Sequence, residues 1–158
     1  MRDEADLDDA APGRFSRSGI LELSAADCWA HLKGRGFGRL AIVVRGVPRV
    51  FPMNYATADG VIVFRTEMGT KLRHGPGAAA CLEVDGYDPR EALGWSVMAT
   101  GRLADITDAG DERSVRLRAL PLVPSAPGER RHWLALEVTE VSGRFFRRGW
   151  LGPAEPNR

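Results

Sequence analysis

The sequence predicts a mainly β domain, a small antiparallel barrel of six or seven strands with two or three short helices. Runs of β-branched and aromatic residues recur at the length of strands, as in Val61–Thr66. Turn-forming residues separate these runs, and the Asp59-Gly60 pair is typical of a hairpin. Gly101 interrupts a long strand-like run, which favours the bend or bulge that small barrels use to close. Together these features predict an antiparallel meander that curls into a barrel.

The first elements are a short strand and a helix. Ile20–Leu23 has strand composition, and Ser24–Asp27 resembles a capping box in which Asp stands where Glu or Gln is usual. The helix should run to about Lys33 and stop at Gly34.

Most of the strands predicted for the barrel lie in the middle of the chain. In order, the expected elements are a strand at Arg39–Val44, a turn at Gly46–Pro48, strands at Arg49–Tyr55 and Val61–Thr66, a short helix or loop at Leu72–Gly77, a strand at Ala78–Val84 and a loop at Asp85–Pro89.

The last third predicts two long strands around a helix. The expected elements are a strand at Trp95–Ile106, a helix at Asp108–Leu120, a Pro-rich linker at Pro121–Gly128, a strand at His132–Val141, a turn at Ser142-Gly143 and a final strand at Arg144–Phe146.

Composition is that of one ordinary domain. The chain has 158 residues, of which 44% are apolar and 27% charged. Its net charge of +1 is uneven, because five acids and only one Arg fall in the first ten residues; the rest carries 21 basic and 16 acidic residues. This mild positive balance suits an anionic small ligand better than duplex nucleic acid. We expect a disordered acidic tail over residues 1–17, a single domain over 18–148 and a C-terminal tail over 149–158.

Other features bound the cellular setting. No apolar run reaches the ~18 residues of a membrane span, and an acidic start is unlike a signal peptide. Cys28 and Cys81 stand far apart, which fits two reduced thiols. His31, His74 and His132 are dispersed, without metal-ligand spacing. We therefore expect a cytoplasmic protein with no metal site.

A candidate anion site lies at the end of the Val61–Thr66 strand. Arg65 offers a guanidinium, Thr66 a hydroxyl, Gly69-Thr70 approachable backbone amides and Lys71 an ammonium, which are the groups that hold a phosphate. Of the 22 basic residues only Lys33 and Lys71 are Lys, so composition does not explain a Lys here. The alternative is a solvated strand end followed by a polar turn.

Seven short motifs occur in a recognisable order. They are Gly38–Ala41, Pro52–Tyr55, Phe64–Thr66, Gly69–Lys71, Glu83–Asp85, Gly94–Val97 with Gly101, and Val141–Arg144. With these motifs the chain resembles the pyridoxamine-5′-phosphate-oxidase-like flavin-binding split barrels, and in particular the small actinobacterial-type members related to the nitroimidazole-reductase group. The resemblance runs from about Leu21 to Phe146.

The resemblance implies a homodimeric split β-barrel with two FMN sites in the subunit interface. It implies that the FMN phosphate is held by Arg65, Thr66 and Lys71, that the isoalloxazine lies along Met53, Asn54 and Tyr55, and that Trp95 and Ser96 approach from a neighbouring strand. One departure is Leu122 after Pro121, where this branch commonly has Trp. A Leu cannot stack or donate as an indole does.

The function these residues predict is a flavin-dependent oxidoreductase acting on an unknown small molecule, with no catalytic side chain assigned. The full set of substrate-phosphate residues of true pyridoxamine-phosphate oxidases is not found, which argues against that activity. One alternative is use of the deazaflavin F420, whose acidic tail would favour a basic groove built from Arg35, Arg39 and Arg73. Another is a flavin or haem carrier or sensor without turnover.

Overall fold

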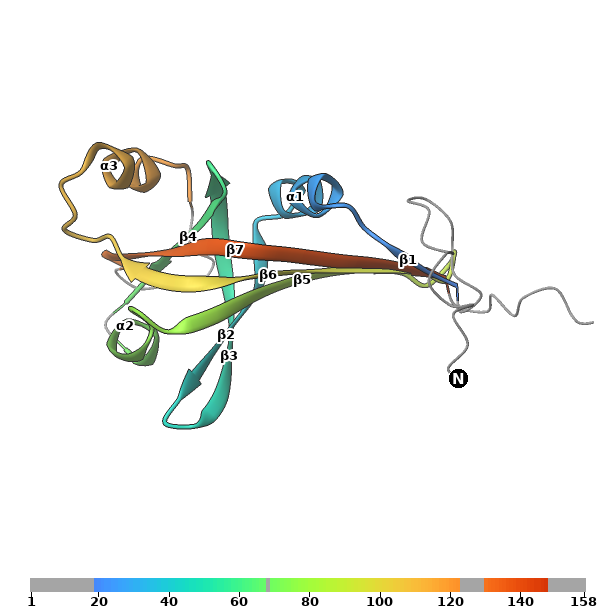
Figure 1. The fold of residues 1–158 in the computed structure, drawn as a ribbon, viewed down its shortest axis with the longest axis horizontal. Helices are drawn as coiled ribbons and strands as arrows, with labels where there is room; N and C mark the ends of the chain where they lie inside the picture. Colours follow the sequence, from blue (N-terminus) through green and yellow to red (C-terminus); the bar gives the residue numbers. More distant parts are fainter. Residues whose placement is uncertain (1–18, 68, 123–129, 148–158) are drawn as a thin grey trace, which may run out of the picture.

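The computed structural model describes residues 19–67, 69–122 and 130–147, and this part of the chain forms seven strands and three helices (Figure 1). The strands are β1 (Ile20–Glu22), β2 (Phe37–Val44), β3 (Val47–Ala58), β4 (Val61–Thr66), β5 (Ala79–Asp88), β6 (Leu93–Asp105) and β7 (His132–Arg147). The helices are α1 (Ala25–Gly34), α2 (Thr70–His74) and α3 (Glu112–Arg118). The tails expected at residues 1–17 and 149–158, and most of the linker expected at 121–128, lie outside the described residues.

All strand pairs are antiparallel and the sheet closes on itself. Its order is β1-β7-β4-β3-β2-β5-β6, and β6 also pairs with β7. The bend expected at Gly101 is confirmed, since the β6–β7 register shifts between Thr100 and Gly101. A Cβ at Gly101 would collide with the Glu137 carbonyl, so only Gly fits there. The predicted antiparallel split barrel is therefore confirmed.

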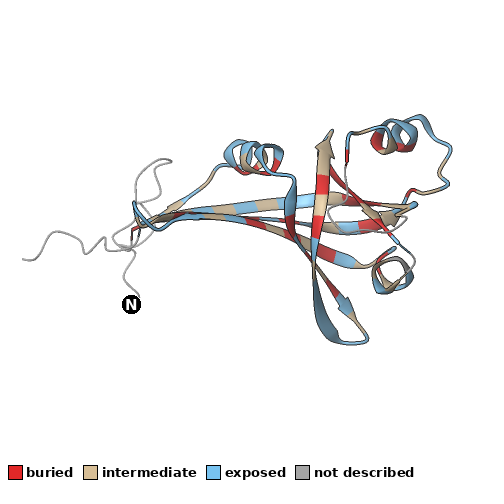
Figure 2. Ribbon diagram, turned by 180° about the vertical axis from the view of Figure 1, so that it is seen from behind, coloured by how far each residue is buried: buried red, intermediate tan, exposed pale blue. Residues whose placement is uncertain are grey.

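Strand β4 lies at the centre of the fold. Its residues from Val61 to Phe64 are at most 1% exposed, because the main core covers one face and a smaller core under α3 covers the other (Figure 2). Burial on both faces explains a continuous apolar run rather than alternation. At its end, Arg65 and Thr66 pair with Trp133 and His132 of β7.

Two predicted turns were wrong. Strand β7 runs unbroken through Ser142-Gly143, where we expected a turn. A Cβ at Gly143 would lie 2.8 Å from Cys28 Sγ, so this Gly permits close packing of α1 rather than a reversal. Strand β5 likewise continues to Asp88, where we expected a loop, and Gly86 leaves room for the Trp95 ring.

The β2–β3 turn is displaced from its predicted place. It consists of Arg45 and Gly46, with φ of 52° and 78°, whereas we expected Gly46–Pro48. Val47 and Pro48 instead belong to β3 and pair with the end of β2. The resulting long hairpin projects away from the barrel on the side of α2 (Figure 1).

Helices α1 and α3 begin at side-chain caps, of which only the one at Ser24 was predicted. Ser24 Oγ accepts the Asp27 amide at 3.2 Å before α1, and Asp111 accepts the Ser114 amide at 2.9 Å before α3. Helix α3 is shorter than the Asp108–Leu120 segment expected. None of the helices in the described ranges is long and apolar enough to cross a membrane.

Candidate functional site

Arg65 and Thr66, the last residues of β4, are held firmly in place. Thr66 is fully buried. The Arg65 Nε–H donates to the Arg130 carbonyl oxygen at 3.1 Å, and its guanidinium lies 5.3 Å from the centroid of the Trp133 ring. The start of β7 thus positions the guanidinium at the end of β4.

Lys71 stands in the first turn of α2, close to this strand end. Its ammonium lies 4.6 Å from the centroid of the Phe51 ring, a cation–π contact from β3. Burial lowers the pKa of Lys71, the neighbouring Arg130 guanidinium lowers it further, and Glu67 partly offsets both. The ammonium is therefore half-buried beside a second positive charge.

Arg130 is the residue that sequence reasoning missed. Its Nε is buried and has no hydrogen-bond partner. No ion pair joins Arg130 or Lys71 to a carboxylate within the residues that the structure describes. The pairing of β4 with β7 is the signal that could have revealed Arg130. This pairing sets Thr66 opposite His132, and Arg130, two residues before His132, therefore lies near the end of β4. Arg65, Lys71 and Arg130 are called the cation cluster below.

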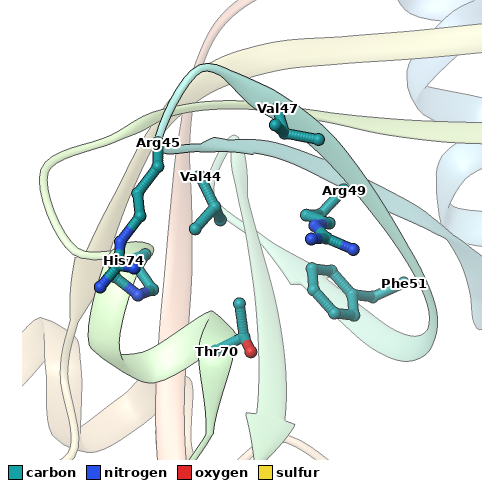
Figure 3. A pocket seen from close by; sticks show the side chains of 7 residues that line it. All are labelled: Val44, Arg45, Val47, Arg49, Phe51, Thr70 and His74. Carbon is teal, nitrogen blue, oxygen red and sulfur yellow. The ribbon is translucent and has the colours of Figure 1, made fainter.

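A pocket adjoins the cation cluster between the β2–β3 hairpin and α2. It has a volume of about 510 Å³, and side chains from the two elements face each other across it (Figure 3). Its lining residues are Val44, Arg45, Val47, Arg49, Phe51, Thr70 and His74. Phe51, whose ring contacts the Lys71 ammonium, joins the pocket to the cluster.

The three predicted residues on β3 point in different directions. Met53 and Tyr55 are 4% and 3% exposed and belong to the core. The Tyr55 hydroxyl donates to the Leu32 carbonyl at 2.7 Å, and burial raises its pKa to about 12. Asn54 lies on the opposite face, paired with Phe37 of β2. A ligand outside the barrel can therefore meet Asn54 and the β3 backbone, while the other two side chains fill the core.

Trp95 and Ser96 lie far from the cation cluster in the same chain. Ser96 pairs with Arg144, whereas Arg65 pairs with Trp133, 11 positions earlier in β7. That separation is roughly 35 Å along the strand. The Trp95 ring stacks on the His31 ring, with 4.0 Å between the two ring centroids. The Arg35 guanidinium lies 5.2 Å from the centroid of the same Trp95 ring. One chain thus brings together the predicted phosphate residues but separates them from Trp95 and Ser96.

Two of the three arginines considered for an F420 tail already contact other side chains of the chain. Arg39 forms ion pairs with Glu83 at 3.0 Å and Asp85 at 2.8 Å, so its charge is already matched. Arg35 instead contacts Trp95. Leu122, the departure from the family pattern, is 8% exposed and so serves packing. Among the described residues no three His, Cys, Asp or Glu side chains gather as metal ligands.

The fold is that of a split β-barrel protein with a cation cluster at one strand end. A family model described as pyridoxamine 5′-phosphate oxidase matches residues 24–145. The chain therefore belongs to this family, which confirms the resemblance drawn from its motifs.

The chain is also similar to individual proteins. The FAD binding protein from Mycobacterium smegmatis is 30% identical, with a TM-score of 0.67 over 80% of this chain and 97% of that one. A candidate 5-nitroimidazole antibiotic resistance protein from Bacteroides thetaiotaomicron shares the fold at 13% identity, with a TM-score of 0.56 over 81% and 89% of the two chains. An uncharacterised protein of Mycobacterium tuberculosis is 27% identical over 95 residues, 56% of this chain, and the chain spans 62% of that relative.

Proposed function

We propose that the protein is a flavin-dependent oxidoreductase that holds the phosphate of FMN in the cation cluster. The observation that carries the proposal is the unmatched positive charge of Lys71 and Arg130, which lie beside each other and have no ion-pair partner among the described residues. Keeping like charges together is unfavourable unless an anion binds between them. A phosphate supplies that anion, and its oxygens can also accept a hydrogen bond from the unpartnered Arg130 Nε.

The residues present fit the rest of the cofactor. Arg65 and Lys71 would hold the phosphate, and the amides at Gly69-Thr70 can be approached closely. Thr66, the third residue predicted to hold it, is fully buried and its hydroxyl donates to the Glu67 carbonyl oxygen at 3.3 Å, so it would support the strand end behind them. Asn54 and the β3 backbone next to Met53 and Tyr55 would meet the polar edge of the isoalloxazine. Bound flavin supplies hydride or electron transfer. The chain's own part is to orient the ring and exclude water from it.

A homodimer is part of the proposal. Since Trp95 and Ser96 lie roughly 35 Å along β7 from the phosphate residues, one flavin could meet both groups only if they came from two chains. The strand registers place exposed apolar side chains on one outer face of the barrel, which two subunits could cover together. They are Phe37, Val43, Val50 and Met98.

We keep two further expectations from the sequence in the proposal, a cytoplasmic location and a small-molecule substrate. Cys28 is buried, Cys81 is half-buried, and both are free thiols, which suits a protein of the cytoplasm. The substrate is an unidentified small molecule. The separate use of FAD is a second candidate, since a relative at 30% identity is described as an FAD binding protein.

Titration of the purified full-length protein tests the proposal. We expect FMN to bind, the Lys71→Ala variant to bind it more weakly, and the flavin to be reduced anaerobically by a nicotinamide donor and reoxidised by an added acceptor. Light scattering of the flavin complex should give a dimer. Absence of binding to FMN, FAD, riboflavin and F420 alike would contradict the flavin proposal, and binding without any turnover would leave a carrier.

A further inference from the structure

Strand β3 has an open edge on the side of the cation cluster. Strand β2 pairs with β3 as far as Asn54, whereas β4 pairs only with its last part, Tyr55–Ala58. Among the described residues, the edge that faces away from β2 therefore has no strand partner from Val47 to Asn54, and its backbone groups can meet a ligand. In the flavin proposal the ring lies near Asn54 and the phosphate near Lys71, whose ammonium contacts Phe51. FMN would thus occupy this edge from Asn54 to about Phe51.

The edge continues past the FMN phosphate into a pocket that carries positive charge. Arg45 lies in the hairpin turn, Arg49 on β3 and His74 at the end of α2, and all three line this pocket of about 510 Å³ (Figure 3). None of its lining residues is acidic. Within residues 19–67, 69–122 and 130–147, no ion pair joins these three side chains to a carboxylate. The pocket therefore favours an anion other than the FMN phosphate.

The pocket also has an apolar side. Val47 and Arg49 alternate along β3 and so share one face, and Val44 pairs with Val47 across the hairpin. Cations and apolar side chains are thus mixed in one concave surface, within the usual size of a small-ligand site. A nucleoside that carries a phosphate matches this lining better than a purely apolar or purely charged ligand.

The distance along β3 indicates which nucleotide could extend this far. Five residues separate Asn54 from Arg49, roughly 17 Å along the strand. A nicotinamide dinucleotide is longer than FMN, so when its nicotinamide lies against the flavin ring its adenosine end can lie beyond the flavin phosphate. NADPH differs from NADH only by a 2′-phosphate on that adenosine, and Arg side chains are the usual partners of this group. Two arginines at the far end of the edge therefore suit NADPH.

We propose that the pocket of Arg45, Arg49 and His74 binds the 2′-phosphate of NADPH, so that NADPH rather than NADH reduces the bound flavin. The inference rests on the proposed function, because it takes FMN to lie along β3 with its phosphate in the cation cluster. The adenine would lie against Val44 and Val47. In the step itself a hydride leaves C4 of the dihydronicotinamide with both electrons of its bond; the donor is oxidised to NADP⁺ and the flavin is reduced.

The first test is anaerobic stopped-flow reduction of the FMN-loaded full-length protein by NADPH and by NADH. We expect kcat/KM to be at least about tenfold higher for NADPH, as one charge-assisted contact would give. The subsite variant, Arg45→Gln with Arg49→Gln, should lower this ratio to about one. The control variant, Arg90→Gln with Arg116→Gln, removes the same charge from exposed sites outside the pocket and should keep the ratio.

A second test needs no turnover. Adenosine 2′,5′-bisphosphate and AMP are titrated calorimetrically into the FMN-loaded protein, since the two probes differ only by the 2′-phosphate. The bisphosphate should bind at least about tenfold more tightly than AMP, and the difference should disappear in the subsite variant. This comparison separates recognition of the 2′-phosphate from a general affinity for adenine nucleotides.

Each outcome decides. Equal reduction by the two donors, faster reduction by NADH, or no reduction by either would overturn this inference while the protein still binds FMN. Equal affinities for the two adenine nucleotides would overturn it as well, and so would a preference for NADPH that survives in the subsite variant. Failure of the unmodified protein to bind any flavin would instead remove the proposed function. Melting curves check both variants, and if the subsite variant does not fold, the two comparisons on the unmodified protein still decide.

Discussion

Two groups of basic side chains on this barrel differ in what surrounds them. Arg113 lies 2.9 Å and 2.8 Å from the two carboxylate oxygens of Glu137, and Arg39 is paired with Glu83 and Asp85. Both arginines are exposed. Lys71 and Arg130 lie at the end of the most buried strand, next to each other and without such a partner among the described residues. The difference separates charges that the fold has matched from charges that an external anion can match.

Charges that the fold leaves unmatched are the better guide to a binding site. Exposed ion pairs add little to stability or specificity, since solvent screens them. Half-buried cations without counterions lower stability, and they cluster where ligands bind. The same reasoning distinguishes Tyr55, whose polar atom is satisfied inside the chain, from the Arg130 Nε, which is not.

The largest effect is expected when both unmatched cations are removed. The Lys71→Ala, Arg130→Ala double variant should lose roughly 100-fold or more in FMN affinity, because two charge-assisted contacts to one phosphate disappear. The flavin-free protein should melt no lower than the unmodified one, since two like charges are gone. Fluorescence titration and melting curves measure the two quantities. A loss below about threefold would show that the phosphate lies elsewhere.

The next effect concerns stability alone. Tyr55→Phe leaves the Leu32 carbonyl without its buried donor, so the free energy of unfolding should fall by about 1–3 kcal/mol. FMN affinity should stay the same, because the hydroxyl faces the core. Urea unfolding and flavin titration test both statements. Tyr87→Phe, at an exposed site, is the matched control, and an FMN loss specific to Tyr55→Phe would place the hydroxyl in the site.

A pH dependence follows from Lys71. Burial and Arg130 hold its folded pKa below the ordinary value of 10.5, so the flavin-free ammonium loses its proton earlier than an exposed one. Anion binding favours the charged form, and FMN affinity should therefore fall as pH rises through the lowered pKa, by at most about tenfold per pH unit. In the flavin-free protein the sign is opposite, and the contribution of Lys71 to stability rises between the lowered pKa and 10.5. Lys71→Arg keeps its charge, so its FMN affinity should show a weaker slope; an identical slope would assign the dependence to another group.

The smallest effect is expected at the matched arginines. Arg113→Ala should reduce the free energy of unfolding by about 0.2–1 kcal/mol, less at high salt, and leave flavin affinity unchanged. Arg39→Ala should behave in the same way, with a small change only. A marked loss of FMN affinity in either variant would remove the distinction between matched and unmatched charges.

Much of the fold was accessible from local sequence. The β4 run, the Asp59-Gly60 turn and the Gly101 irregularity each follow from residues close together in the chain. Gly143 misled because a glycine needed for close packing has the same sequence signal as one needed for a turn. The hairpin turn was misplaced because Pro48 tolerates a strand position as well as a turn.

The candidate site was only half accessible, for a different reason. Arg65, Thr66 and Lys71 are close in sequence, so their proximity needs no knowledge of the fold. Arg130 joins them through the register of β4 with β7, which no local pattern encodes. The same register separates Trp95 and Ser96 from the cluster, a fact that short motifs cannot reveal.

The most direct test of the phosphate site compares FMN with riboflavin, which has the same ring but no phosphate, on the unmodified protein and on Lys71→Ala. FMN affinity should fall roughly 10- to 150-fold, as expected for one charge-assisted hydrogen bond of about 1.5–3 kcal/mol, while riboflavin affinity hardly changes. Lys33→Ala, which removes the other lysine, an exposed residue of α1, should affect neither ligand. Equal losses for FMN and riboflavin in Lys71→Ala, or no loss for either, would mean that Lys71 does not contact a flavin phosphate.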